Sequence, residues 1–127
     1  MSSVLASLVV TALFLAVAAV EGRRVGRTGK PYGFVWTTIH IVLFALVVSG
    51  VIASIYKLQA LSSGGRYVQI ALYIAMLTLL INLAIGARMI LIKNRSGTLI
   101  AIHSASTVVM AISILASILF ATAAIYP

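Results

Sequence analysis

Four apolar runs, each close to the length needed to cross a lipid bilayer, dominate this sequence of 127 residues. They cover about residues 4–20, 34–56, 67–87 and 98–125, and the first is near the lower limit of about 17 residues for a membrane-spanning helix. Backbone amides inside hydrocarbon must bond within their own helix or within a closed barrel, and runs of this length favour helices. The sequence therefore predicts an all-α integral membrane protein in contact with the lipid bilayer.

Short polar connections, each containing glycine, separate the four predicted helices. Helices joined in this way pack antiparallel, with sequence neighbours side by side. We expect one domain, residues 1–127, that forms an antiparallel four-helix bundle in which the second and fourth helices run in the same direction. No cation precedes the first run, as it would in a secretory signal peptide, and we expect this run to remain as a helix.

The cations are distributed unequally between the two ends of the predicted bundle. Cytoplasmic loops of membrane proteins carry an excess of Lys and Arg. The richer side should therefore face the cytoplasm, with both termini outside, and the net charge of +8 indicates headgroup contacts rather than a nucleic-acid partner. One side holds Arg23, Arg24, Arg27, Lys30, Arg88, Lys93 and Arg95, and the other holds Lys57 and Arg66.

Small residues recur at intervals that let membrane helices approach closely, although Ala and Ser are common in any such helix. The pairs are Ser49 with Ala53, Ala101 with Ala105, and Ser113 with Ser117.

Both histidines of the chain, His40 and His103, lie inside predicted membrane helices. An ionisable side chain at that depth is costly unless it is paired, which makes each a functional candidate. At a rise of about 1.5 Å per residue, both lie roughly 8–9 Å below the same boundary, and Asn82 on the third helix falls at a similar depth. Arg24 precedes His40 by 16 residues and Arg88 precedes His103 by 15, so a duplicated hairpin is one interpretation.

Two imidazoles at one level of a bundle can bind a haem iron from its two sides. With both axial positions filled, the function expected of such a haem is one-electron transfer. Thr37, Thr107 and Asn82 are candidate hydrogen-bond partners for the imidazoles. Each has an alternative role, since membrane Thr side chains often bond their own backbone and a lone Asn often joins two helices. The candidate partners of the haem propionates are Arg23, Arg24, Arg27, Arg88 and Arg95.

The placement of His40 and His103 on the second and fourth helices, near basic turns, resembles that of membrane b-type cytochromes of the cytochrome b561 kind. The resemblance covers the four-helix core and implies haem b, with His40 and His103 as axial ligands of its iron. Larger proteins of that kind have two histidine pairs and two haems, whereas this chain has one pair. The resemblance implies electron exchange with a quinone or a partner subunit.

Other functions remain open from the sequence. The histidines could bond within the bundle and bind nothing, as in a structural or assembly subunit of a larger membrane complex or homo-oligomer. A small four-helix multidrug transporter matches the length, but cation transport coupled to protons needs an acid within the membrane. The only acid, Glu21, is expected at the edge of the first basic turn, neutralised by Arg23 or Arg24. We expect no independent enzymatic activity, since the sequence pairs no nucleophile with a base.

Overall fold

Four long helices make up the computed structural model, which describes residues 1–28, 32–60, 65–92 and 96–125. They are α1 (Ser2–Thr28), α2 (Phe34–Gln59), α3 (Arg66–Leu91) and α4 (Gly97–Ala123). Each is long and apolar enough to cross a membrane. The prediction of an all-α membrane bundle is confirmed, and the chain is an integral, multi-pass membrane protein.

Three of the helices extend further than the apolar runs predict. α1 continues past Val20 to Thr28, α2 past Tyr56 to Gln59, and α3 past Ala87 to Leu91. The change from apolar to cationic residues marks the membrane boundary, but it does not end the helical hydrogen bonding. A glycine inside a helix costs only about 1 kcal/mol relative to alanine, so Gly22 and Gly26 do not end α1, contrary to the prediction of a turn at that point.

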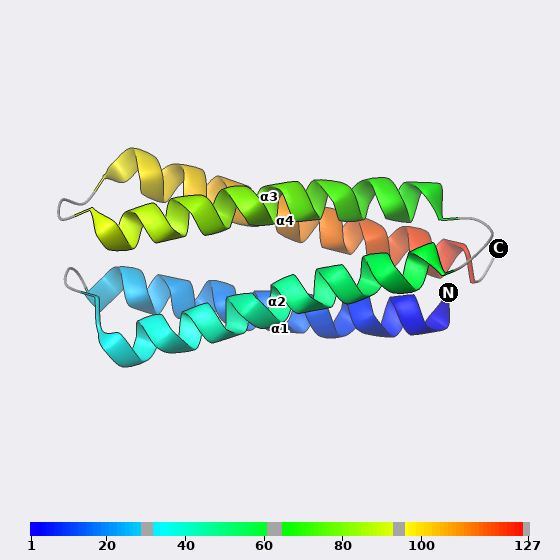
Figure 1. The fold of residues 1–127 in the computed structure, drawn as a ribbon, viewed down its shortest axis with the longest axis horizontal. Coiled ribbons are helices and arrows are strands. Elements are labelled where there is room, and N and C mark those ends of the chain that lie inside the picture. The colour runs from blue at the N-terminus through cyan, green and yellow to red at the C-terminus, as the bar shows by residue number, and fades with distance from the viewer. Residues whose placement is uncertain (29–31, 61–64, 93–95, 126–127) are drawn as a thin grey trace.

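The helices form two hairpins that pack on each other (Figure 1). The closest pairings are α1 with α2 and α3 with α4, while α1 with α4 and α2 with α3 complete the ring. Both chain ends lie at one end of the bundle, which agrees with the up-down-up-down topology. α2 and α4 do not pair directly, because they are diagonal to each other across the centre.

The interior combines a few large apolar side chains with small polar ones. Leu8, Leu72, Leu79, Met110 and Ile114 are fully or almost fully buried. The outer faces are apolar as well, with exposed leucines, isoleucines and valines along every helix. A surface of this kind is stable where the surrounding solvent is lipid.

Hydroxyl groups in the interior bond to their own helices. Ser113 donates to the Val109 carbonyl at 2.9 Å and Ser117 to the Ser113 carbonyl at 2.8 Å, and both serines are buried, as expected of residues at a close helix contact. Ser49, Ala101 and Ala105 are exposed, so their spacing does not mark a contact between helices.

Candidate functional site

The two histidine rings meet between the helices, towards the basic end of the bundle. Their centroids lie 6.4 Å apart and the ring planes cross at 64°. His40 comes from α2 and His103 from α4, which are diagonal, so the rings approach across the centre rather than along one helix contact. The comparison of depths from the sequence thus predicts their proximity.

A backbone carbonyl of α1 fixes the orientation of the His40 ring. Nδ1 of His40 lies 3.0 Å from the Ala18 oxygen. A carbonyl oxygen only accepts hydrogen bonds, so Nδ1 must carry the proton and Nε2 of a neutral ring holds the free lone pair. A Cβ added to Gly22 would lie 2.9 Å from Cε1 of His40, so the ring occupies space that only a glycine leaves open. The imidazole is therefore held in a tautomer that suits metal binding through Nε2.

The His103 ring packs against a glycine of its own hairpin in a similar way. A Cβ added to Gly86 would lie 3.6 Å from Cε1 of His103, an ordinary contact distance. Nδ1 of His103 is buried and has no hydrogen-bond partner among the described residues. The backbone carbonyl of His103 accepts from Thr107 at 2.8 Å and from Ser106 at 3.0 Å, which steadies the helix at this point.

Asn82 joins α3 to α4 one helical turn deeper than His103. Its Nδ2 donates to Thr107 Oγ1 at 2.9 Å, and that hydroxyl in turn donates to the His103 carbonyl. Asn82 therefore joins two helices and Thr107 bonds its own backbone, the alternative roles foreseen for them. Among the described residues, neither side chain bonds an imidazole nitrogen. Thr37 lies one turn above His40 with a buried hydroxyl.

Four buried side-chain atoms lack hydrogen-bond partners within the described residues, and one comes from each helix. They are Glu21 Oε2, Thr37 Oγ1, Asn82 Oδ1 and His103 Nδ1. All four residues lie within about one helical turn of the contacts that the histidines make with Gly22, Gly86 and Thr107. Burial without a partner costs about 1–3 kcal/mol for such a group. We call this level of the bundle the histidine layer.

Glu21 belongs to the histidine layer, although the sequence predicts it at the edge of a turn. It lies inside α1 rather than in a turn, is 8% exposed, and pairs with Arg24 at 3.1 Å. The expectation that Arg23 or Arg24 neutralises it is confirmed for Arg24. The Arg24 guanidinium also lies 5.4 Å from the centre of the Trp36 ring, which connects α1 to α2 above the histidines.

The other candidate partners of a haem propionate lie around the same end of the bundle. Arg23, Arg27 and Arg88 are exposed, whereas Arg95 falls outside the described residues. Arg24 is exposed too, but its guanidinium pairs with Glu21, so Arg23, Arg27 and Arg88 are the remaining candidates among the described residues.

The separation of the two ring centres is close to that of imidazoles on opposite sides of one metal ion. With each nitrogen about 2 Å from a metal, ring centres on its opposite sides lie roughly 6 Å apart, close to the observed 6.4 Å. The described residues contain no cluster of three or more His, Cys, Asp or Glu side chains for a metal ion held by protein ligands alone. The donor set of two imidazoles in an apolar bundle suits haem better than a bare ion.

Sequence reasoning missed the two glycines that face the imidazoles. A signal was present, because Gly22-Arg23-Arg24 and Gly86-Ala87-Arg88 share a Gly-x-Arg pattern, 18 and 17 residues before His40 and His103. Each hairpin thus pairs its glycine with its own histidine.

Comparison with protein-family models, with curated proteins and with solved structures found no significant match.

Proposed function

We propose that this protein is a membrane b-type cytochrome, or a subunit of one, that holds one haem b between His40 and His103. The observation that carries the proposal is the meeting of two imidazoles from diagonal helices at 6.4 Å, with Nδ1 of one bonded to the Ala18 carbonyl. When bound, a haem with two histidine ligands supplies one-electron chemistry.

The residues around the histidines have roles consistent with this function. The Ala18 carbonyl sets the proton of His40 on Nδ1, which leaves Nε2 for the iron. Gly22 and Gly86 give each ring room to settle against the neighbouring helix. The exposed guanidinium groups of Arg23, Arg27 and Arg88 are placed to bind carboxylates at the basic end.

The proposal includes an orientation and a set of partners. The basic end, and with it the histidine layer, faces the cytoplasm, and both termini lie outside. Electrons pass to or from a quinone or a partner subunit, and the outer apolar faces provide the surface for such a subunit or for a second copy of the chain.

Visible absorption spectroscopy of the purified protein, expressed with an ample haem supply, tests the proposal. We expect the sharp reduced-state bands of a six-coordinate haem b, with about one haem per chain. His40→Ala and His103→Ala should each abolish these bands, because one imidazole alone leaves an axial position open. Thr38→Ala is the matched control, since Thr38 is exposed on α2, two residues from His40, and bonds only to its own helix.

A rescue experiment separates ligation from a structural role. His40→Gly or His103→Gly should regain the six-coordinate spectrum when free imidazole is added, because the added ring can replace the missing ligand. A colourless wild-type protein, or bands that survive both alanine substitutions, would contradict the proposal and favour a structural subunit without haem.

A further inference from the structure

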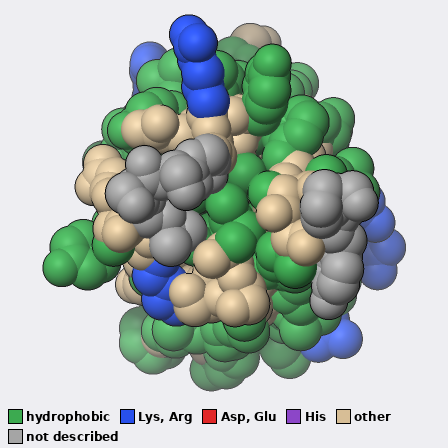
Figure 2. Space-filling model, turned by 90° about the vertical axis from the view of Figure 1, so that its right-hand side faces the viewer, with side chains coloured by type: hydrophobic (Ala, Val, Ile, Leu, Met, Phe, Trp, Pro, Cys, Tyr) green, Lys and Arg blue, Asp and Glu red, His purple; other side chains and the backbone are tan. Residues whose placement is uncertain are grey.

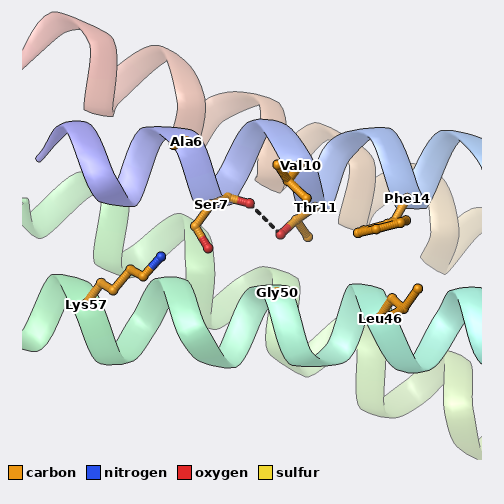
Figure 3. Close-up of a pocket in the computed structure, with 8 residues that line it drawn as sticks. All are labelled: Ala6, Ser7, Val10, Thr11, Phe14, Leu46, Gly50 and Lys57. Carbon is orange, nitrogen blue, oxygen red and sulfur yellow. Dashed lines mark hydrogen bonds between the residues drawn. The ribbon is translucent and has the colours of Figure 1, made fainter.

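A groove runs along the surface between α1 and α2, at the end of the bundle away from the histidines. Its volume is about 410 Å³ and it is open on one side (Figure 3). Val10 and Phe14 of α1 and Leu46 of α2 form its apolar part. The small residues Ala6 and Ser7 leave space on the α1 side, and Gly50 lines the groove where α2 meets Thr11.

The outer end of the groove is polar and cationic. Figure 3 shows the Lys57 nitrogen and the Ser7 hydroxyl directed into the space between the two helices. Thr11 takes no part in this end, because its hydroxyl donates to the Ser7 carbonyl at 2.7 Å. The groove therefore has a donor pair at its mouth and apolar walls beyond.

The Lys57 ammonium has no acidic side chain near it in this chain. The single acidic residue, Glu21, pairs with Arg24 towards the opposite end of α1. Viewed from the end that carries both termini, the visible surface is largely apolar with scattered cations and no acidic side chain (Figure 2). No acidic side chain of this chain pairs with Lys57, and at the end of a membrane helix lipid headgroups are anions within reach of its ammonium.

The length of the groove matches half of a bilayer. Lys57 lies in the last turn of α2, at the level of the headgroups. Leu46 is 11 residues earlier, roughly 16 Å along the helix axis, and half of a hydrocarbon core is about 15 Å thick. The apolar part therefore reaches from the headgroup level to about the midplane, which is the depth of one acyl chain.

We infer that this groove is a binding site for one anionic phospholipid, with its phosphate on Lys57 and Ser7 and one acyl chain along Val10, Phe14 and Leu46. The site is independent of the haem proposal, because it shares no residue with the histidine layer. It also gives the α1–α2 hairpin a fixed lipid contact in the leaflet that the histidines do not occupy.

Native mass spectrometry of the full chain, extracted from mixed phosphatidylcholine and phosphatidylglycerol bilayers, tests this inference. The wild-type protein should retain one phosphatidylglycerol in preference to phosphatidylcholine, and Lys57→Gln should lower that preference about fivefold. Arg66→Gln is the matched control, since it removes the other cation at this end, is exposed, and does not line the groove.

A second pair of variants tests the apolar part without touching a charge. Ala6→Leu places a larger side chain in the groove and should lower lipid retention, whereas Ala16→Leu, at an exposed position of α1 outside the groove, should not. Three outcomes would overturn the inference. The wild type could retain the two lipids equally, or Lys57→Gln and Arg66→Gln could have equal effects. A neutral isoprenoid could also copurify in place of phospholipid.

Discussion

At the scale of single residues, the contact between Gly22 and His40 is the most restrictive feature of the histidine layer. The imidazole is fixed on one side by its bond to the Ala18 carbonyl and limited on the other by the α1 backbone at Gly22. A side chain at position 22 would have to push the ring away from the carbonyl that holds its proton.

Gly22→Ala should therefore destabilise the bundle. The added Cβ would lie 2.9 Å from Cε1 of His40, and overpacking of this kind costs about 1–3 kcal/mol, more than the alanine gains in helix propensity. Thermal unfolding of the helical circular dichroism signal in detergent measures the effect. Because the clash involves the ring alone, the result does not depend on a bound haem.

Gly26→Ala is the matched control for that substitution. Gly26 lies one turn further along α1, and a Cβ there meets no atom within 4 Å. The change should stabilise the protein by about 0.5–1 kcal/mol through lower backbone entropy in the unfolded chain. If the two alanine variants unfolded at the same temperature, the contact of Gly22 with His40 would make no measurable contribution to stability.

The sequence predicts which residues reach the histidine layer better than it predicts what they contact. Depth along a helix follows from residue counting, which brings His40 and His103 to one level and places Asn82 within about one helical turn of them. The direction in which each side chain points around the helix axis does not follow from residue counting. Core-facing and lipid-facing positions are both apolar, so the hydropathy pattern does not distinguish them. For this reason the glycine contacts and the bond from Asn82 to Thr107 emerge only from the structure.

At the scale of helices, α1 and α2 approach closely where Gly50 faces Thr11. A Cβ at Gly50 would overlap the Thr11 hydroxyl and lie 3.1 Å from Thr11 Cβ. Thr11 is fully buried and its hydroxyl bonds to the α1 backbone. The two helices can therefore keep their spacing only while position 50 has no side chain.

Gly50→Ala should loosen the α1–α2 hairpin at a cost of about 1–3 kcal/mol. Thermal unfolding in detergent gives the size of the loss. Thr11→Ala removes the atoms that collide with the new Cβ, so the double variant should be more stable than the sum of the two single effects predicts, with a coupling of about 0.5–3 kcal/mol. Strictly additive effects would show that the helices do not meet at this pair.

The helices themselves follow from the sequence, while their lengths do not. Hydropathy finds the part of each helix that lies in hydrocarbon, and all four predicted runs fall largely within helices of the structure. Residues 21–28 of α1 include three arginines, one glutamate and two glycines, so they carry little apolar signal, yet they remain part of the helix. The expectation that the first basic turn begins near Glu21 is wrong for that reason.

At the scale of the whole molecule, the two hairpins present their histidines in a similar way. Each brings a glycine from its first helix against the imidazole of its second, and the two imidazoles then meet across the bundle. The shared contact of a glycine with an imidazole is a closer similarity between the two hairpins than the spacing from arginine to histidine in the sequence. It also places the histidine layer in the half of the bundle that carries most of the cations.

The uneven distribution of cations makes the orientation of the molecule testable. Among the described residues, four arginines lie at the histidine end and two cations at the other, so the histidine end should face the cytoplasm. The chain has no cysteine, and single-cysteine variants therefore label without background. Gln59 at the end of α2 and Thr98 near the start of α4 are both exposed and lie at opposite ends of the bundle. In intact cells a membrane-impermeant maleimide should react with Gln59→Cys and not with Thr98→Cys. Equal labelling of the two variants after permeabilisation is the control, and labelling of Thr98→Cys in intact cells at the rate of Gln59→Cys would contradict this orientation.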